Sequence, residues 1–203
     1  MAQFRMALRR SRWLSLVALF TALAVVLNGL TIPAPYEPFL LYGVWEIPVL
    51  LALMFLGFWG GAAVAGLNGL ALEFVNPGGL PTGPLYNLIA EVSMFFGVMG
   101  FQYVASRRGW RGYAEMAGAT SLGAATRTAV MTVVNWFVLA QPYPIGFGSF
   151  GLTQTDVPAL LVFIGVFNLT VTLYTVPAAY SIRRAVQTRY GSLVGRPGQV
   201  LTA

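Results

Sequence analysis

Long apolar stretches with almost no charged side chains follow one another along this sequence. Charged residues make up 9% of its 203 positions and hydrophobic residues 57%, and the mean hydropathy is +0.72. Soluble domains carry about 25% charged residues, so a soluble fold of this size would lack the charges needed to cover its surface. A helix needs roughly 20 apolar residues to cross a bilayer. The sequence therefore predicts an all-α membrane protein with a single integral membrane domain over residues 1–203.

Clusters of Pro and Gly divide these stretches into six predicted transmembrane helices. Both residue types favour turns and interrupt helices. TIPAPYEP follows the first span, NPGGLPTGP the third and QPYPIGFGSFG the fifth, while a short GFWGG turn separates the second span from the third. The predicted spans are about 13–32, 40–57, 59–76, 84–105, 113–140 and 157–182, followed by a cytoplasmic tail at 188–203.

The positions of the basic residues predict the orientation. The chain has twelve Arg and no Lys. Eleven of the Arg lie before the first span, between the fourth and fifth spans, or after the sixth, and the three loops expected on the outside contain none. Because cytoplasmic loops are enriched in basic residues, we expect a multi-pass protein of the cell membrane with both termini in the cytoplasm. The first apolar stretch is long for a secretory signal, so we expect an uncleaved helix there.

The residue types that are missing narrow the function. The chain has no Cys and no His, which removes disulfides, thiolate chemistry, the usual proton shuttle and the commonest metal ligand. It also lacks the GxxxxGK[ST] nucleotide-binding motif. We therefore expect a protein that is not an enzyme and has no cofactor, metal site or nucleic-acid partner. A binding subunit that takes its energy from other subunits fits these limits.

Ionisable residues inside the predicted spans mark a candidate site, because a charge is costly inside a bilayer. They are Glu46, Glu73, Glu91 and Arg127, and they are accompanied by Asn68, Asn87, Asn135 and Asn168. Most of these residues fall in the outer half of their spans, beneath the loops rich in Pro and Gly. The sequence thus predicts a ligand-binding pocket between the fourth, fifth and sixth spans that opens to the outside.

Helical spacing supports this pocket. Asn87 and Glu91 are four residues apart and share one face of the fourth span. Arg127 and Asn135 share a face of the fifth span in the same way. Aromatic rings close to polar groups suit a flat heterocycle with polar edges. The candidate ligand-binding residues are Trp45, Asn87, Glu91, Arg127, Asn135, Trp136 and Asn168.

A structural role for the same residues stays open. Glu91 and Arg127 would then pair and stabilise helix packing, and the Asn side chains would join helices by hydrogen bonds. Trp residues near span ends commonly anchor a helix at the membrane interface.

Four stretches of the chain carry a family pattern. They are EIPVLLALMFLGFWGGAAVAGLNGL (46–70), PTGPLYNLIAE (81–91), TAVMTVVNWFVLAQPY (128–143) and VFNL (166–169). In this order, and across essentially all six spans, the chain resembles the substrate-binding S component of energy-coupling factor (ECF) vitamin transporters. More narrowly, it resembles the riboflavin-type S component, with its Met-x-x-x-Asn-aromatic run in the fifth span and its Phe-Asn segment in the sixth.

The resemblance implies a function and a set of partners. An S component binds a vitamin, here riboflavin, with high affinity beneath its outside loops. It delivers the vitamin by toppling against a transmembrane T subunit that two cytoplasmic ATPases drive. By motif, Asn135 and Asn168 would contact the ligand, and the Ala-x-x-x-Ala pair of Ala18 and Ala22 would dock on the T subunit.

Alternatives to riboflavin stay open. Many riboflavin-type members carry a Lys shortly after the sixth-span Asn, where this chain has Thr170 and Val171. Thiamine, pantothenate and a pyridoxine-like ring are alternative ligands, and the acidic residues would suit a cationic one such as thiamine. A self-sufficient proton-coupled carrier that uses Glu91 or Glu46 is a different class of function, and a membrane scaffold without a small ligand is a third.

Overall fold

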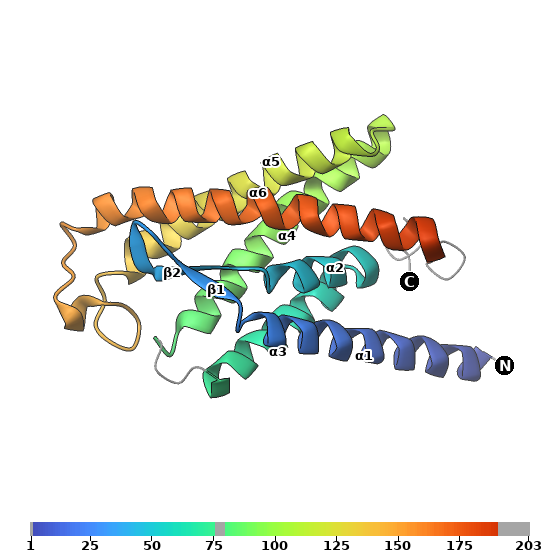
Figure 1. The fold of residues 1–203 in the computed structure, drawn as a ribbon, viewed down its shortest axis with the longest axis horizontal. Coiled ribbons are helices and arrows are strands. Elements are labelled where there is room, and N and C mark those ends of the chain that lie inside the picture. The colour runs from blue at the N-terminus through green and yellow to red at the C-terminus, as the bar shows by residue number, and fades with distance from the viewer. Residues whose placement is uncertain (1, 76–79, 191–203) are drawn as a thin grey trace.

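Six α-helices and one β-hairpin form the described part of the chain. The computed structural model describes residues 2–75 and 80–190, and in that part of the chain most residues are helical, which confirms the prediction of a mainly helical protein (Figure 1). The helices are α1 (Ala2–Leu27), α2 (Glu46–Leu56), α3 (Phe58–Val75), α4 (Gly83–Arg108), α5 (Tyr113–Val138) and α6 (Val157–Tyr190). A single 3-10 turn, η1 (Gly148–Phe150), interrupts the connection between α5 and α6.

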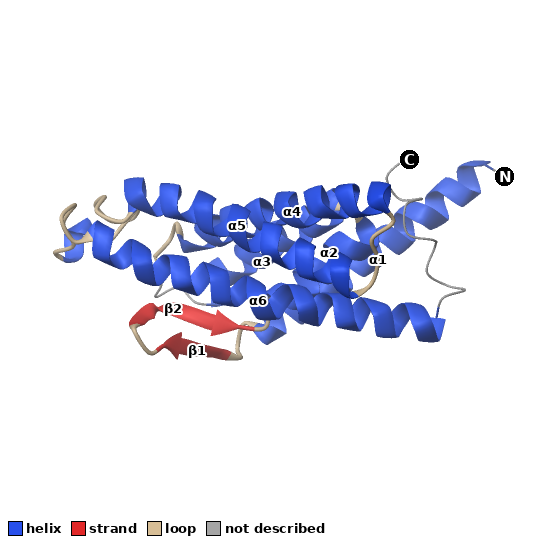
Figure 2. Cartoon of the chain, turned by 90° about the horizontal axis from the view of Figure 1, so that it is seen from above, coloured by secondary structure: helices blue, strands red, loops and turns tan. Residues whose placement is uncertain are grey.

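The hairpin lies between α1 and α2, where the sequence predicts the ends of two helical spans. Strand β1 (Thr31–Ala34) pairs antiparallel with β2 (Glu37–Gly43), with Thr31 opposite Gly43 and Ile32 opposite Tyr42. The predicted first span therefore loses its last residues, because α1 ends at Leu27, and residues 40–43 of the predicted second span are extended. Proline explains the difference: three Pro between positions 33 and 38 remove backbone donors that a helix needs. Figure 2 shows the hairpin lying along one side of α6.

A tight turn joins α2 to α3 at Gly57. Its φ of 79° is a conformation that glycine adopts without a side-chain clash, and its N–H donates to the carbonyl of Leu53 at 3.0 Å. α2 has 11 residues and so is about 16 Å long, too short to cross a bilayer core of about 30 Å alone. The chain thus runs in one direction through β2 and α2, and in the opposite direction through α3 (Figure 1).

Helices α4 and α5 approach each other closely enough to require glycine. A Cβ added to Gly97 of α4 would lie 2.5 Å from the carbonyl oxygen of Leu122 and 2.7 Å from the Cα of Gly123, both on α5. Backbone atoms cannot swing aside as a side chain does, so only glycine fits here. The main apolar core lies alongside, between α1, α2, α3 and α4, with Val49, Leu50, Val64, Met94, Phe95 and Val98 among its fully buried members.

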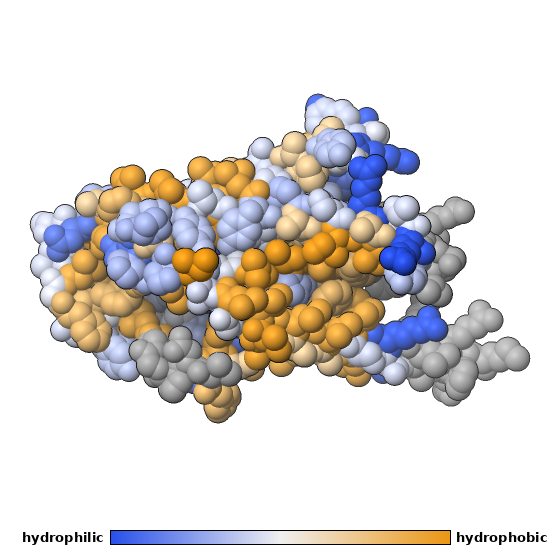
Figure 3. All heavy atoms as spheres, viewed as in Figure 1, coloured by the Kyte–Doolittle hydropathy of each residue, from blue (hydrophilic) through white to orange (hydrophobic). Residues whose placement is uncertain are grey.

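The outer surface of the helices is apolar over the middle of the molecule. Large exposed hydrophobic residues occur on every long helix. On the face seen in Figure 3, apolar side chains gather over the middle of the molecule, between more hydrophilic ends. In the described residues, three helical segments are long and apolar enough to cross a membrane: Arg10–Leu27, Gly83–Arg108 and Val157–Tyr190. Apolar surface of this extent is what a lipid environment accommodates, and the structure indicates a membrane protein.

The two ends of the molecule are formed by different segments of the chain. The start of α1, the turn between α4 and α5 and the end of α6 lie at one end, while the hairpin and the α5–α6 connection lie at the other (Figure 1). Of the predicted tail, residues 188–190 continue α6, and residues 191–203 lie outside the described part of the chain.

Candidate ligand-binding site

An ion pair lies buried where α2, α5 and α6 meet. Arg127 of α5 donates to both carboxylate oxygens of Glu46, the first residue of α2, with Nη1···Oε2 at 2.6 Å and Nη2···Oε1 at 2.8 Å. Both residues are almost completely buried, with 3% and 4% of their surfaces exposed. A two-bond pair of this kind has the planar geometry that makes Arg–carboxylate contacts strong and directional.

Asn168 of α6 accepts a hydrogen bond from the third guanidinium nitrogen of Arg127, Nε. The Nε of Arg127 donates to the Oδ1 of Asn168 at 2.9 Å, and the Nδ2 of Asn168 donates to the carbonyl of Ile164 at 2.9 Å. Both ends of the Asn amide are therefore used, so its orientation is fixed. The site joins three helices through one Arg.

Glu91 of α4 completes this polar cluster but lacks a hydrogen-bond donor. Its Oε1 lies 3.8 Å from Nη1 of Arg127, within ion-pair range but beyond hydrogen-bond length. Only 1% of the residue is exposed, and neither carboxylate oxygen has a hydrogen-bond partner among the described residues. Two carboxylates facing one guanidinium leave an excess of one negative charge when both are ionised. A buried charge without a partner costs several kcal/mol.

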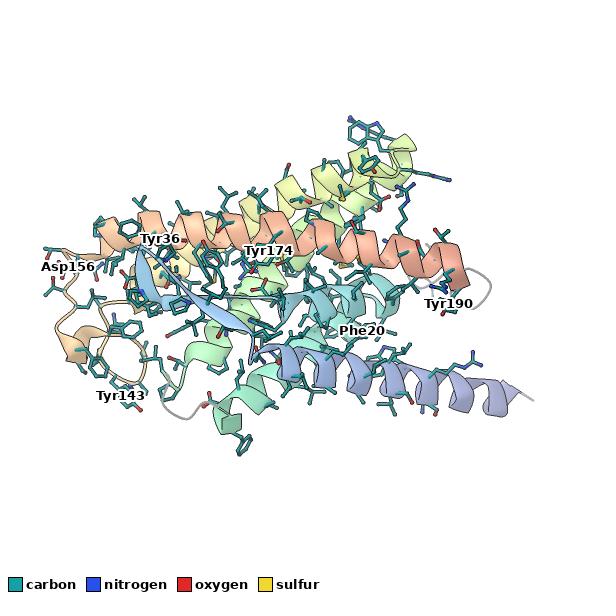
Figure 4. All side chains as sticks on the ribbon, viewed as in Figure 1. Phe20, Tyr36, Tyr143, Asp156, Tyr174 and Tyr190 are labelled. Carbon is teal, nitrogen blue, oxygen red and sulfur yellow. The ribbon has the colours of Figure 1, made fainter. Side chains whose placement is uncertain are left out.

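A hollow of about 370 Å³ opens near the end of the molecule that carries the hairpin. It lies between β2, the α5–α6 connection and the start of α6, and is lined by Glu37, Phe39, Phe147, Phe150, Gly151, Leu152, Asp156 and Leu160. Figure 4 labels Asp156 at this end, beyond the start of α6. The hollow is within the size range of small-molecule sites.

One face of α6 connects the hollow with the polar cluster. Leu160 lines the hollow, Ile164 is buried one turn further on, and Asn168 belongs to the cluster. Residues four apart share a helix face, and eight residues correspond to about 12 Å of helix. Hollow and cluster therefore lie about 12 Å apart along this face of α6, with the buried Ile164 between them.

The hairpin rests on another part of α6 through tyrosine side chains. The hydroxyls of Tyr42 and Thr170 lie 2.7 Å apart, the hydroxyl of Tyr36 bonds to that of Tyr42, and the Tyr36 and Tyr42 rings pack on Phe163 and Phe167. Partial burial, together with the Tyr42 hydroxyl, raises the pKa of Tyr36 to about 12. The hairpin is thus a cover held on α6 by hydroxyl contacts and aromatic packing.

A second contact ties the end of the hairpin to the cluster. Tyr174 of α6, labelled near the middle of that helix in Figure 4, donates from its hydroxyl to the carbonyl of Gly43 at 2.6 Å. Gly43 ends β2, and the buried Trp45 and Glu46 follow two and three residues later. The end of β2, held by Tyr174, therefore lies only three residues before Glu46 in the chain.

The structure places the predicted ligand-binding residues in two groups. Glu91, Arg127 and Asn168 meet in the cluster, and Trp45 is buried next to Glu46. Asn135 and Trp136 lie two turns further along α5, where the Nδ2 of Asn135 donates to the carbonyl of Met131 at 2.7 Å. Asn87 is exposed near the start of α4. No hydrogen bond within residues 2–75 and 80–190 joins Asn87, Asn135 or Trp136 to the cluster.

The sequence marks Glu46 as a costly buried acid but does not place it among the ligand-binding residues. In the structure it is the closest partner of Arg127, ahead of Glu91, although 81 positions separate the two residues in the chain. Helical spacing relates residues within one span and gives no information across that distance. The hairpin tyrosines are not predicted either, because a segment rich in Pro indicates a loop.

The predicted docking pair lies on the surface. Ala18 and Ala22 of α1 are both exposed, whereas Val17, Phe20 and Ala24 of the same helix pack into the core. The two Ala thus share a face that is available to another protein or to lipid.

Comparison with known proteins identifies the fold. The class is a membrane-embedded helical bundle with a hairpin between its first two helices. A scan of protein-family models finds no match, and a search of curated proteins finds none. A solved structure described as the S component of a bacterial ECF transporter is similar, with a TM-score of 0.70 over 89% of this chain and 98% of that chain. At 19% sequence identity this likeness shows the fold, and the chain has the fold of that S component.

Proposed function

We propose that the protein is the vitamin-binding membrane subunit of an ECF-type importer. The observation that carries the proposal is the similarity of fold to an S component along nearly the whole length of both chains. The hollow at the hairpin end and the buried polar cluster beneath it supply a place for a small ligand. On this proposal the protein itself has no enzymatic activity, and separate ATPase subunits supply the energy.

The proposed topology has six crossings and both termini in the cytoplasm. The start of α1 and the end of α6 lie at the same end of the molecule, together with the Arg-rich turn between α4 and α5 (Figure 1). The positive-inside rule assigns that end to the cytoplasm. The hollow then faces outward, where a nutrient arrives.

Riboflavin is the first ligand to test, because the motifs in the fifth and sixth spans resemble the riboflavin-type S component. The predicted contacts Asn135 and Trp136 lie near the α5–α6 connection that helps to form the hollow. Thiamine, pantothenate and a pyridoxine-like ring are the alternative ligands.

A proton-coupled carrier is the second candidate function, and the buried, unpartnered carboxylate of Glu91 is the observation that favours it. Uptake by such a carrier would require no ATPase and would collapse when the proton gradient is dissipated.

Ligand binding and coupled transport test the proposal. The purified protein in detergent is titrated with riboflavin and the alternative vitamins while Trp fluorescence is followed. It is then reconstituted in vesicles with and without a T subunit and its two ATPases. Saturable binding of one vitamin, with uptake only in the presence of ATP and the partner subunits, supports the proposal. Uptake by the protein alone, driven by a proton gradient, would show a carrier instead.

A further inference from the structure

We propose that this site selects an organic cation, whose positive charge compensates the carboxylate of Glu91. The inference rests on the proposed function and narrows its ligand class. It favours a molecule with a flat apolar body and a cationic head over a neutral or anionic vitamin.

The first observation is the unfilled acceptor in the polar cluster. Arg127 is already committed, through Nη1 and Nη2 to Glu46 and through Nε to Asn168. Its single positive charge faces both Glu46 and Glu91, and the two buried oxygens of Glu91 accept no hydrogen bond from the described residues. Buried carboxylates are normally paired, because desolvation without compensation is costly. One positive charge brought by a ligand would complete the cluster.

The second observation is the lining of the hollow. The charged side chains that line it, Glu37 and Asp156, are both acidic, and three aromatic rings, Phe39, Phe147 and Phe150, lie among them. Aromatic faces attract cations, and the effect is stronger where water is excluded. Asp156 already accepts from the backbone N–H of Thr153 through its Oδ2, so this carboxylate is held in place. Carboxylates beside aromatic rings suit an organic cation better than an anion.

Charge is also separated along the molecule. Four of the six acidic residues belong to the hollow or the cluster, namely Glu37, Glu46, Glu91 and Asp156. Apart from Arg127, each Arg whose side chain the structure describes belongs to the start of α1, the α4–α5 turn or the last part of α6. A cleft lined by one sign of charge concentrates ions of the opposite sign and speeds their arrival.

The ligand would lie along the face of α6 between hollow and cluster. Its ring would lie among the Phe side chains and Leu160, and its cationic head would reach Glu91 past Ile164. Because Ile164 and Glu91 are buried, the apolar side chains between the two places must move when the head binds.

A bound proton is the competing source of the missing positive charge. A protonated Glu91 would neutralise the cluster without any organic cation, and the site would then have no preference for ligand charge. The two sources differ in what the Glu91→Gln substitution does. Gln copies the shape of a protonated Glu, whereas it cannot replace a carboxylate that binds a cation.

The test compares three vitamins of different charge on the purified full chain: thiamine as the cation, riboflavin as the neutral molecule and pantothenate as the anion. We expect the wild-type protein to bind thiamine at least about tenfold more tightly than either of the others, and Glu91→Gln to lose at least about tenfold of that affinity. Glu91→Asp keeps the charge and should retain part of it. Glu73→Gln removes an exposed acid outside the cluster and should bind thiamine as the wild type does.

Each outcome separates the inference from the proposed function. Tight binding of riboflavin or pantothenate with weak thiamine binding overturns the cation inference and supports a vitamin-binding subunit. Unchanged thiamine binding by Glu91→Gln, with a carboxylic-acid infrared band that this variant loses, assigns the charge to a proton and also overturns the inference. Binding of none of the vitamins counts against both. If the Glu91 variants fail to fold, the relative affinities of the wild-type protein for thiamine, riboflavin and pantothenate decide whether the site selects a cation.

Discussion

Arg127 is the residue on which the polar cluster depends. Its guanidinium compensates Glu46 by two hydrogen bonds, and these groups are withdrawn from solvent. Removing one member of a buried ion pair leaves the other charge without compensation, whereas removing both can be nearly neutral. The cost of a single substitution is therefore mostly the penalty of the charge that remains.

Arg127→Met should lower the free energy of unfolding by about 3–5 kcal/mol. The double variant Arg127→Met with Glu46→Met should recover much of that loss, and chemical unfolding in detergent measures both. Arg107→Met, at an exposed position near the end of α4, is the control and should change stability by less than about 0.5 kcal/mol. Equal losses in the single and double variants would contradict a coupled pair.

Tyr36 gives the hairpin a dependence on alkaline pH. Burial and the Tyr42 hydroxyl raise the pKa of Tyr36 from 10.0 to about 12. A group with a raised pKa in the folded state stabilises that state fully below pH 10 and loses its contribution as the pH rises through about 12. Ultraviolet difference absorbance between the wild type and Tyr36→Phe should show one phenol that ionises near the upper value. Ionisation at the ordinary tyrosine value would mean that the hairpin does not cover this hydroxyl.

Residue type and position in a span are enough to identify part of the site. Glu91, Arg127 and Asn168 stand out in the sequence because polar groups are costly inside a membrane, and the structure brings these three together. Their detailed pairing is not predictable, since Glu46 reaches Arg127 only after three helices have assembled around it. The contact made by Thr170 is also not predictable from the sequence. In the sequence this residue is a departure from a family pattern, and its contact with Tyr42 depends on a hairpin that the sequence does not reveal.

At the scale of elements, the helices are easier to predict than the segment between α1 and α2. For α4 the predicted span 84–105 lies within Gly83–Arg108, because the apolar run ends at two Arg and a Gly. The hairpin is not predictable in the same way, because Pro33, Pro35 and Pro38 mark a break in helix without indicating what replaces it. Strand pairing here depends on packing against α6, which is a tertiary effect.

The contact between α4 and α5 offers a test of helix packing. Gly97→Ala would place a methyl group against the backbone of α5 and should cost about 1–3 kcal/mol, because the two helices must separate. Gly100→Ala, one turn further on, meets only Leu122 Cδ2 at 3.9 Å and is the matched control. Thermal unfolding of both variants measures the difference. A Gly97→Ala variant as stable as Gly100→Ala would show that the helices lie further apart.

At the scale of the whole molecule, α1 presents its exposed face to the surroundings. If the protein works as an importer subunit, the Ala18→Trp and Ala22→Trp double variant should abolish reconstituted transport by blocking close helix contact, and should leave ligand binding unchanged. Leu16→Trp is the control, because it is also exposed but lies roughly 160° around the helix from Ala18. Transport by the double variant at the wild-type rate would remove α1 as the docking helix. Loss of ligand binding would assign these Ala to the fold.

The buried pair of Glu46 and Arg127 also has a consequence for how the chain is made. A lone Arg in the middle of a helix opposes insertion by the translocon by about 2.5–3.5 kcal/mol. The acid that compensates Arg127 belongs to α2, so it is synthesised 81 residues earlier and is already in the bilayer when α5 emerges from the ribosome. We therefore expect a helix made earlier to assist the insertion of α5, and a chain that lacks Glu46 to insert α5 less efficiently.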